Sequence, residues 1–92
     1  MDLQDIRVEI DKTDKEIIAL YEKRLSLVNK VAEYKIANNK PVYDEKREQE
    51  KIASMRALTD DEMTADDIEA IYQLIFKLSR DRQNKIIGKK EQ

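Results

Sequence analysis

LQDIRVEIDKTDKEIIALYEKRLSLVNKVAEYKIAN, residues 3–38, is an unbroken stretch without glycine or proline. Its apolar residues recur at steps of three, four and seven, the spacing that places side chains on one face of an α-helix. They are Leu3, Ile6, Ile10, Ile17, Leu20, Tyr21, Leu25, Val28, Val31 and Ala32. The segment Asn38-Asn39-Lys40-Pro41 should end the helix, because the residue before proline avoids the α region and asparagine tolerates a left-handed cap. The sequence therefore predicts one amphipathic helix over residues 3–38.

The length of this helix indicates an assembly of more than one chain. A helix of about 35 residues is roughly 50 Å long, whereas a compact globule of this chain length is about 30 Å across. The helix must extend beyond its own domain, and its apolar face would stay exposed to water unless another chain covers it. We expect a two-fold symmetric homodimer in which the long helices pack together.

A second, shorter helix is predicted over about residues 44–58. Asp44 has the position of an N-cap, and Ile52, Met55 and Leu58 fall on one apolar side. The stretch 59–63 is expected to be a loop.

A third helix is predicted over about residues 65–87. Thr64 followed three residues later by Asp67 resembles a capping arrangement, and Gly88 with the polar tail should end the helix. Its apolar positions are Ile68, Ile71, Tyr72, Ile75, Leu78 and Ile86. The expected fold class is all-α, with three helices, one of them very long, in a single domain over residues 1–92.

The composition limits the chemistry. The chain has 92 residues without Cys or His, so it lacks thiol nucleophiles, the commonest metal ligand and the usual proton shuttle near neutral pH. Both charge signs are interspersed and the net charge is −2, so we expect no nucleic-acid partner and only small anions as ligands. No apolar run reaches the roughly 18 residues of a membrane span, and the N-terminus lacks the layout of a signal peptide. We expect a cytoplasmic protein without a membrane partner or a metal.

Cations occur on the apolar stripe of the first helix. Arg24 and Lys35 lie eleven residues apart, with Val28 and Val31 between them on that face. Eleven residues are almost three turns, about 16 Å, so two long side chains leaning toward each other can hold a small dianion. Because an amphipathic helix usually keeps its cations on the solvent side, this pair suggests a ligand site. Arg7 is about 42 Å from Lys35 along the helix and would complete only the partner's pocket, in an antiparallel dimer.

Polar residues on the other two helices fit the same site. Asp44 and Glu48 are four residues apart and face the same way, with Arg47 one step round the turn. Ser79 and Gln83 form a similar pair that can donate hydrogen bonds without bringing charge. Each residue alone is compatible with a solvated helix surface, a plain N-cap or a surface ion pair. Their combination predicts a small-anion site among three helices.

Several segments match, in order and spacing, those of one enzyme family. They are Ile6-Arg7 with Ile10 and Asp14, Ala19-Leu20 with Arg24, Val31 through Lys35, Lys40 through Asp44 with Arg47-Glu48, and Ser79 with Gln83. Through them the chain resembles the all-helical, AroQ-type (type II) chorismate mutases along nearly its whole length. The resemblance implies an intertwined dimer with two equivalent pockets. It also implies the pericyclic (Claisen) rearrangement of chorismate to prephenate, on the route to phenylalanine and tyrosine.

The resemblance also implies a role for each matching residue. Arg24 would hold one substrate carboxylate, with Ser79 close to it, and Arg7 of the partner chain would hold the other. Lys35 and Gln83 would donate to the ether oxygen of the breaking bond. These two donors are the expected catalytic residues.

The remaining matches concern the ring hydroxyl of the substrate. Glu48, with Asp44 at the helix start, would hold this hydroxyl, and Arg47 would support the acidic pair. A one-substrate rearrangement needs no nucleophile, proton shuttle, metal or cofactor, so we expect no cofactor. It needs a folded substrate conformer and donors aimed at the oxygen that gains negative charge.

Two other functions fit the same sequence. Relatives of this family eliminate pyruvate from isochorismate to give salicylate. The same arginines that would bind the substrate carboxylates would serve that reaction. A non-catalytic helical dimer with a regulatory or scaffold role is the alternative from another class. The sequence is also compatible both with a free-standing enzyme and with the mutase portion of a longer fused polypeptide.

Overall fold

The computed structural model describes residues 1–91, and their side chains as far as Lys89. Helix α1 spans Leu3–Ala37, α2 spans Glu45–Arg56 and α3 spans Glu62–Glu91. The predicted all-α class with three helices is confirmed, since this part of the chain contains no strand. None of these helices has the length and low charge that a membrane span requires.

Both ends of α1 are set by local hydrogen bonds. At its start the Asp2 carboxylate accepts from the backbone N–H of Asp5 at 2.9 Å, while the Asp5 carboxylate accepts from that of Asp2, which makes a capping box. At its end Asn39 adopts a left-handed conformation with φ of 52°, and the backbone N–H of Lys40 donates to the Lys35 carbonyl at 2.9 Å. Helix α1 thus ends one residue before the predicted boundary, at the asparagine pair.

Asp44 is the N-cap of α2, as the sequence predicts. Its carboxylate accepts from the backbone N–H of Arg47 at 3.0 Å, and this bond satisfies one of the free donors of the first turn. The helix ends at Arg56, two residues before the predicted end.

The predicted ends of α3 are wrong on both sides. The Asp61 carboxylate accepts from both the backbone N–H and the hydroxyl of Thr64, and the first of these bonds measures 3.0 Å. These bonds also lower the pKa of Asp61. Thr64 therefore lies within the first turn, and the helix begins at Glu62 because Asp61 caps it. Gly88 does not end the helix, because glycine weakens a helix interior by only about 1 kcal/mol.

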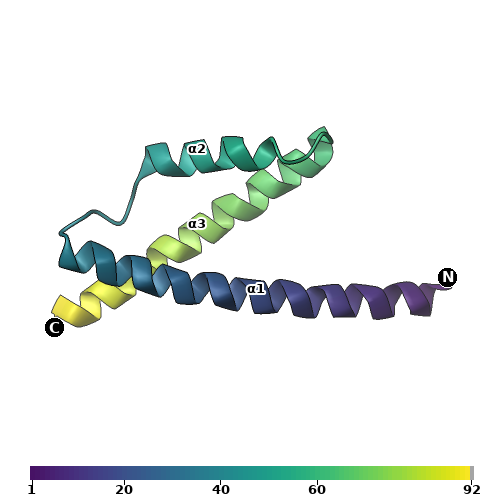
Figure 1. The fold of residues 1–92 in the computed structure, drawn as a ribbon, viewed down its shortest axis with the longest axis horizontal. Coiled ribbons are helices and arrows are strands. Elements are labelled where there is room, and N and C mark those ends of the chain that lie inside the picture. Colours follow the sequence, from purple (N-terminus) through teal and green to yellow (C-terminus); the bar gives the residue numbers. More distant parts are fainter. Residues whose placement is uncertain (92) are drawn as a thin grey trace.

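Helix α3 packs against both α1 and α2, whereas α1 and α2 do not pack on each other within the described residues. Figure 1 shows α3 crossing α1 near the C-terminal ends of both helices, while the N-terminal half of α1 extends away from the other two. The buried apolar core is small, and all of residues 1–20 are exposed. The core consists of Val28, Ala32, Met55, Ala65 and Phe76.

This single chain is too open to be a compact globule. Its radius of gyration is 16.7 Å, whereas about 12 Å is typical of 92 residues. It exposes 7542 Å², whereas a compact monomer of this mass would expose about 5,600 Å². Large apolar side chains along α1, including Leu3, Ile10 and Ile17, are each more than half exposed. About 2,000 Å² of surface is thus in excess of what a compact chain of this size would present.

Candidate active site

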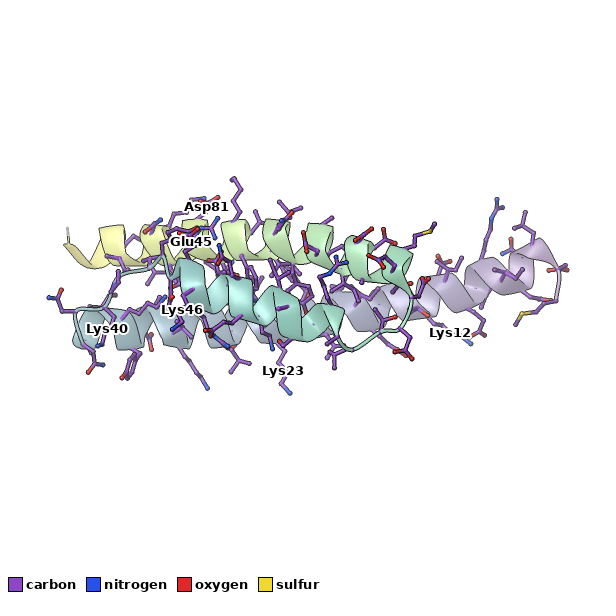
Figure 2. The ribbon with its side chains drawn as sticks, turned by 90° about the horizontal axis from the view of Figure 1, so that it is seen from above. Lys12, Lys23, Lys40, Glu45, Lys46 and Asp81 are labelled. Atoms are coloured by element: carbon purple, nitrogen blue, oxygen red, sulfur yellow. The ribbon has the colours of Figure 1, made fainter. Side chains whose placement is uncertain are left out.

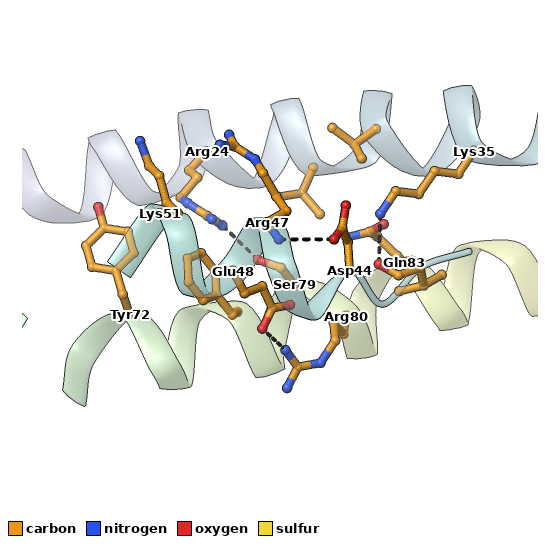
Figure 3. Close-up of a pocket in the computed structure, with 14 residues that line it drawn as sticks. Arg24, Lys35, Asp44, Arg47, Glu48, Lys51, Tyr72, Ser79, Arg80 and Gln83 are labelled. Atoms are coloured by element: carbon orange, nitrogen blue, oxygen red, sulfur yellow. Dashed lines mark hydrogen bonds and ion pairs between the residues drawn. The ribbon is translucent and has the colours of Figure 1, made fainter. Parts of the chain in front are cut away.

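A pocket of about 380 Å³ lies among the three helices and the segment that joins α1 to α2, residues 38–44, called the connector below. Its wall contains seven of the eight residues that the sequence predicts for the site. They are Arg24, Lys35, Asp44, Arg47, Glu48, Ser79 and Gln83. Apolar side chains complete the lining, among them Val28 and Val31 of α1 and Phe76 of α3. Figure 3 shows these side chains converging from segments that are far apart in the sequence.

Arg24 is held in the pocket by residues of α3. Its Nη1 donates to the Ser79 Oγ at 2.7 Å, and its guanidinium carbon lies 5.9 Å from the centre of the Phe76 ring. Ser79 is buried, so this bond is shielded from water. A guanidinium has five N–H donors. A held guanidinium of this kind is suited to binding a carboxylate with two parallel hydrogen bonds.

Lys35 connects the end of α1 to the connector. Its Nζ donates to the Val42 carbonyl at 2.8 Å, and its side chain is half-buried. An ammonium has three donors, and the bond to Val42 orients the group while using one of them. Figure 3 shows Lys35 and Gln83 among the side chains that line the same pocket, so both groups are available to one ligand.

Gln83 is a buried polar side chain in the pocket wall, with 6% of its surface exposed. No hydrogen-bond donor within the described part of the chain reaches its Oε1. A buried polar atom without a partner costs about 1–3 kcal/mol. A carboxamide retained at this cost in a pocket is typical of a group that binds a ligand.

The two carboxylates of the pocket have different partners. The Asp44 carboxylate accepts from the backbone of α2, whereas Glu48 forms an ion pair with Arg80 of α3. The hydrogen bond to Glu48 raises the pKa of Arg80, and the guanidinium lies 4.8 Å from the centre of the Tyr43 ring. Arg80 was not among the site residues predicted from the sequence. Its position could have indicated a place in the site, because a residue next to Ser79 and three residues before Gln83 lies beside the face of α3 that carries these two residues.

Lys51 of α2 also lines the pocket and was missed. It lies one turn beyond Arg47, so it shares the face of α2 that borders the site. With it the wall holds five cations, Arg24, Lys35, Arg47, Lys51 and Arg80, and two carboxylates. Five minus two leaves a formal excess of three positive charges, although the whole chain has a net charge of −2. This excess favours an anionic ligand.

Arg7 is not brought into this pocket. It is exposed on the N-terminal half of α1, about 25 Å along the helix from Arg24. No side chain spans that distance, so Arg7 cannot contribute to the pocket of its own chain.

The described residues also contain no group of acidic side chains suited to holding a metal ion.

The structure is all-helical, with a pocket whose lining has an excess of positive charge. Comparison with known proteins shows the family to which the chain belongs. The chain belongs to the chorismate mutase type II family, whose model matches residues 6–84. The resemblance noted from the sequence is thereby confirmed.

Two curated relatives are similar to this chain. It is 36% identical over 91 residues to a bifunctional chorismate mutase/prephenate dehydratase of Buchnera aphidicola, a match that covers 96% of this chain and 23% of that protein. It is 46% identical over 46 residues to the T-protein of Haemophilus influenzae, a match that covers 50% of this chain and 12% of that protein. The chain thus spans less than a quarter of the length of these relatives. No solved structure matches it.

Proposed function

We propose that this chain is a chorismate mutase, which rearranges chorismate to prephenate on the route to phenylalanine and tyrosine. The observation that carries the proposal is the charge and hydrogen-bonding content of one pocket. Seven family-matching side chains line it, with a formal excess of three positive charges and a buried carboxamide whose NH2 group can donate to a ligand. Chorismate is a dianion with an ether oxygen and a ring hydroxyl, and this lining offers groups that can bind one carboxylate, the ether oxygen and the hydroxyl.

In the proposed mechanism the protein selects a conformer and stabilises charge. Arg24 holds one carboxylate of the substrate, so that the enolpyruvyl arm folds over the ring. Lys35 and Gln83 donate to the ether oxygen, which gains negative charge as its bond to carbon breaks. The carboxylate of Glu48 accepts from the ring hydroxyl. An acceleration of about 10⁶ needs roughly 8 kcal/mol, which is within reach of orientation combined with two preorganised donors.

The proposed active form is an intertwined homodimer. The excess exposed surface of about 2,000 Å² per chain falls in the range of about 1,000–2,500 Å² per partner that obligate dimers bury. Most of the exposed large apolar residues of α1 lie on its N-terminal half, which no other helix of the chain covers. An antiparallel pairing of two α1 helices brings Arg7 of one chain to the pocket of the other. Arg7 then holds the second carboxylate in trans.

The test of the proposed function is chorismate consumption by the purified protein. We expect prephenate as the product, with no added metal or cofactor. Isochorismate is assayed in parallel, and release of pyruvate and salicylate from it, without chorismate turnover, would replace the mutase by a pyruvate lyase. If the protein acts on neither substrate and a transition-state analogue does not raise its Tm, it is a non-catalytic dimer.

Substitution of Gln83 tests the proposed donor role. A carboxamide donates at every pH, whereas glutamic acid donates only when it is protonated. We expect the wild-type kcat to be nearly flat from weakly acid to neutral pH. We expect the kcat of Gln83→Glu to rise as the pH falls, because the introduced carboxyl gains its proton near or somewhat above its usual pKa of about 4.3.

Gln73→Glu is the matched control for this prediction. Gln73 lies on the same helix, is exposed and does not line the pocket, so this variant has the same charge change away from the site. It should keep the wild-type pH profile. A Gln83→Glu variant whose profile is also unchanged would refute the donor role of Gln83.

A further inference from the structure

Arg80 of α3 contacts two different parts of the pocket wall. Its Nη1 donates to Oε1 of Glu48 on α2, and its guanidinium lies over the ring of Tyr43 in the connector. The side chains of Arg80 and Glu48 are only 28% and 20% exposed, so both charged groups are largely withdrawn from water. Figure 3 shows this pair at the pocket edge between α2 and α3. The guanidinium is thus fixed by a carboxylate and by an aromatic face at once.

This contact determines how Glu48 can meet a ligand. A glutamate side chain loses considerable rotamer freedom when it is held in one position. The ion pair with Arg80 provides that restraint, because it holds the Glu48 carboxylate through residues of the chain itself. Of the two carboxylate oxygens, Oε1 accepts from Arg80, and the other remains to accept from a ligand hydroxyl. Arg80 therefore restrains an acceptor that lines the pocket.

We propose that Arg80 is a positioning residue for substrate recognition, which holds the Glu48 carboxylate so that its second oxygen accepts the ring hydroxyl of the substrate. The inference rests on the proposed function, because it takes the hydroxyl contact of Glu48 from it. Arg80 does not touch the breaking bond. Its loss should therefore weaken substrate binding in ground state and transition state alike, which raises KM and leaves kcat largely unchanged.

Two transition-state analogues separate this role from a purely structural one. Both are dicarboxylates of the same shape, and one retains the ring hydroxyl while the other lacks it. For Arg80→Met we expect the Kd of both analogues to rise, because a cation of the pocket wall is lost, and the Kd of the hydroxylated analogue to rise about tenfold more than that of the analogue without the hydroxyl. Lys77→Met is the matched control, because Lys77 lies one turn away on α3, in an exposed pair with Asp81. It should change neither Kd.

Arg80→Lys and a double variant keep the proposal testable if Arg80→Met folds poorly. Arg80→Lys retains the cation but lacks the planar fork of the guanidinium, so the Kd of the analogue without the hydroxyl should stay near wild type while that of the hydroxylated analogue rises, by less than in Arg80→Met. In a Glu48→Gln background, loss of Arg80 should not lower the preference for the hydroxylated analogue much further, because the two residues act as a unit in recognising the hydroxyl. Equal weakening of both analogues by Arg80→Met, or additive losses of the hydroxyl preference in the double variant, would overturn the proposal. Failure of wild type to bind either analogue would instead refute the proposed function itself.

Discussion

Lys35→Ala is expected to lower kcat by about 10²–10³-fold, the usual loss when one preorganised donor to a developing anion is removed. The Lys35 ammonium is already oriented by its bond of 2.8 Å to the Val42 carbonyl. Its stabilisation therefore needs little reorganisation when charge appears on the ether oxygen. The interaction is stronger in the transition state than in the ground state, so kcat and kcat/KM should fall together.

The same substitution should leave the protein folded. It removes one partly buried hydrogen bond, which is worth about 1 kcal/mol, and it leaves the apolar surfaces of α1 intact. Circular dichroism and the oligomeric state should match wild type, with a modest decrease in Tm. Lys30→Ala is the matched control, because Lys30 is an exposed lysine of α1 outside the pocket. A Lys35→Ala variant with near wild-type kcat would show that Lys35 is not the donor.

Mixing two inactive variants should restore activity if Arg7 acts in trans. In a heterodimer of Arg7→Ala and Lys35→Ala chains, the pocket of the first chain keeps its own Lys35 and receives Arg7 from the second. The other pocket lacks both groups. Random exchange of equal amounts makes about half of the dimers mixed, each with one complete pocket of two, so we expect about one quarter of the wild-type rate.

Arg24→Ala mixed with Lys35→Ala is the control for this experiment. Arg24 and Lys35 line the same pocket of one chain, so every pocket in that mixture lacks one of them. No recovery is expected there. Native mass spectrometry should demonstrate subunit exchange in both mixtures. Without recovery in the Arg7 mixture despite exchange, Arg7 would have no role in the partner's pocket.

The helix ends show where local sequence signals compete. Asp44 was predicted correctly as a cap, because it follows Pro41 and precedes a clear helical segment. At the start of α3, Asp61 and Thr64 are both good capping residues, and the choice depends on which one the backbone geometry favours. The stronger acceptor, a carboxylate, caps the helix and receives the Thr64 hydroxyl as well. Because aspartate ranks above threonine as an N-cap, the residue types by themselves favour Asp61, and this boundary could have been predicted from the sequence.

The sequence by itself determined the three helices, the excess length of α1 and the face on which Arg24 and Lys35 lie, because helical periodicity assigns each side chain to a direction around its own axis. Only the tertiary structure decided which groups meet across helices. Glu48 and Arg80 are 32 residues apart, and their ion pair depends on how α2 and α3 are rotated and spaced. The unpartnered oxygen of Gln83 likewise depends on what surrounds it. Periodicity contains no information on rotation or spacing between helices, since side-chain packing sets both.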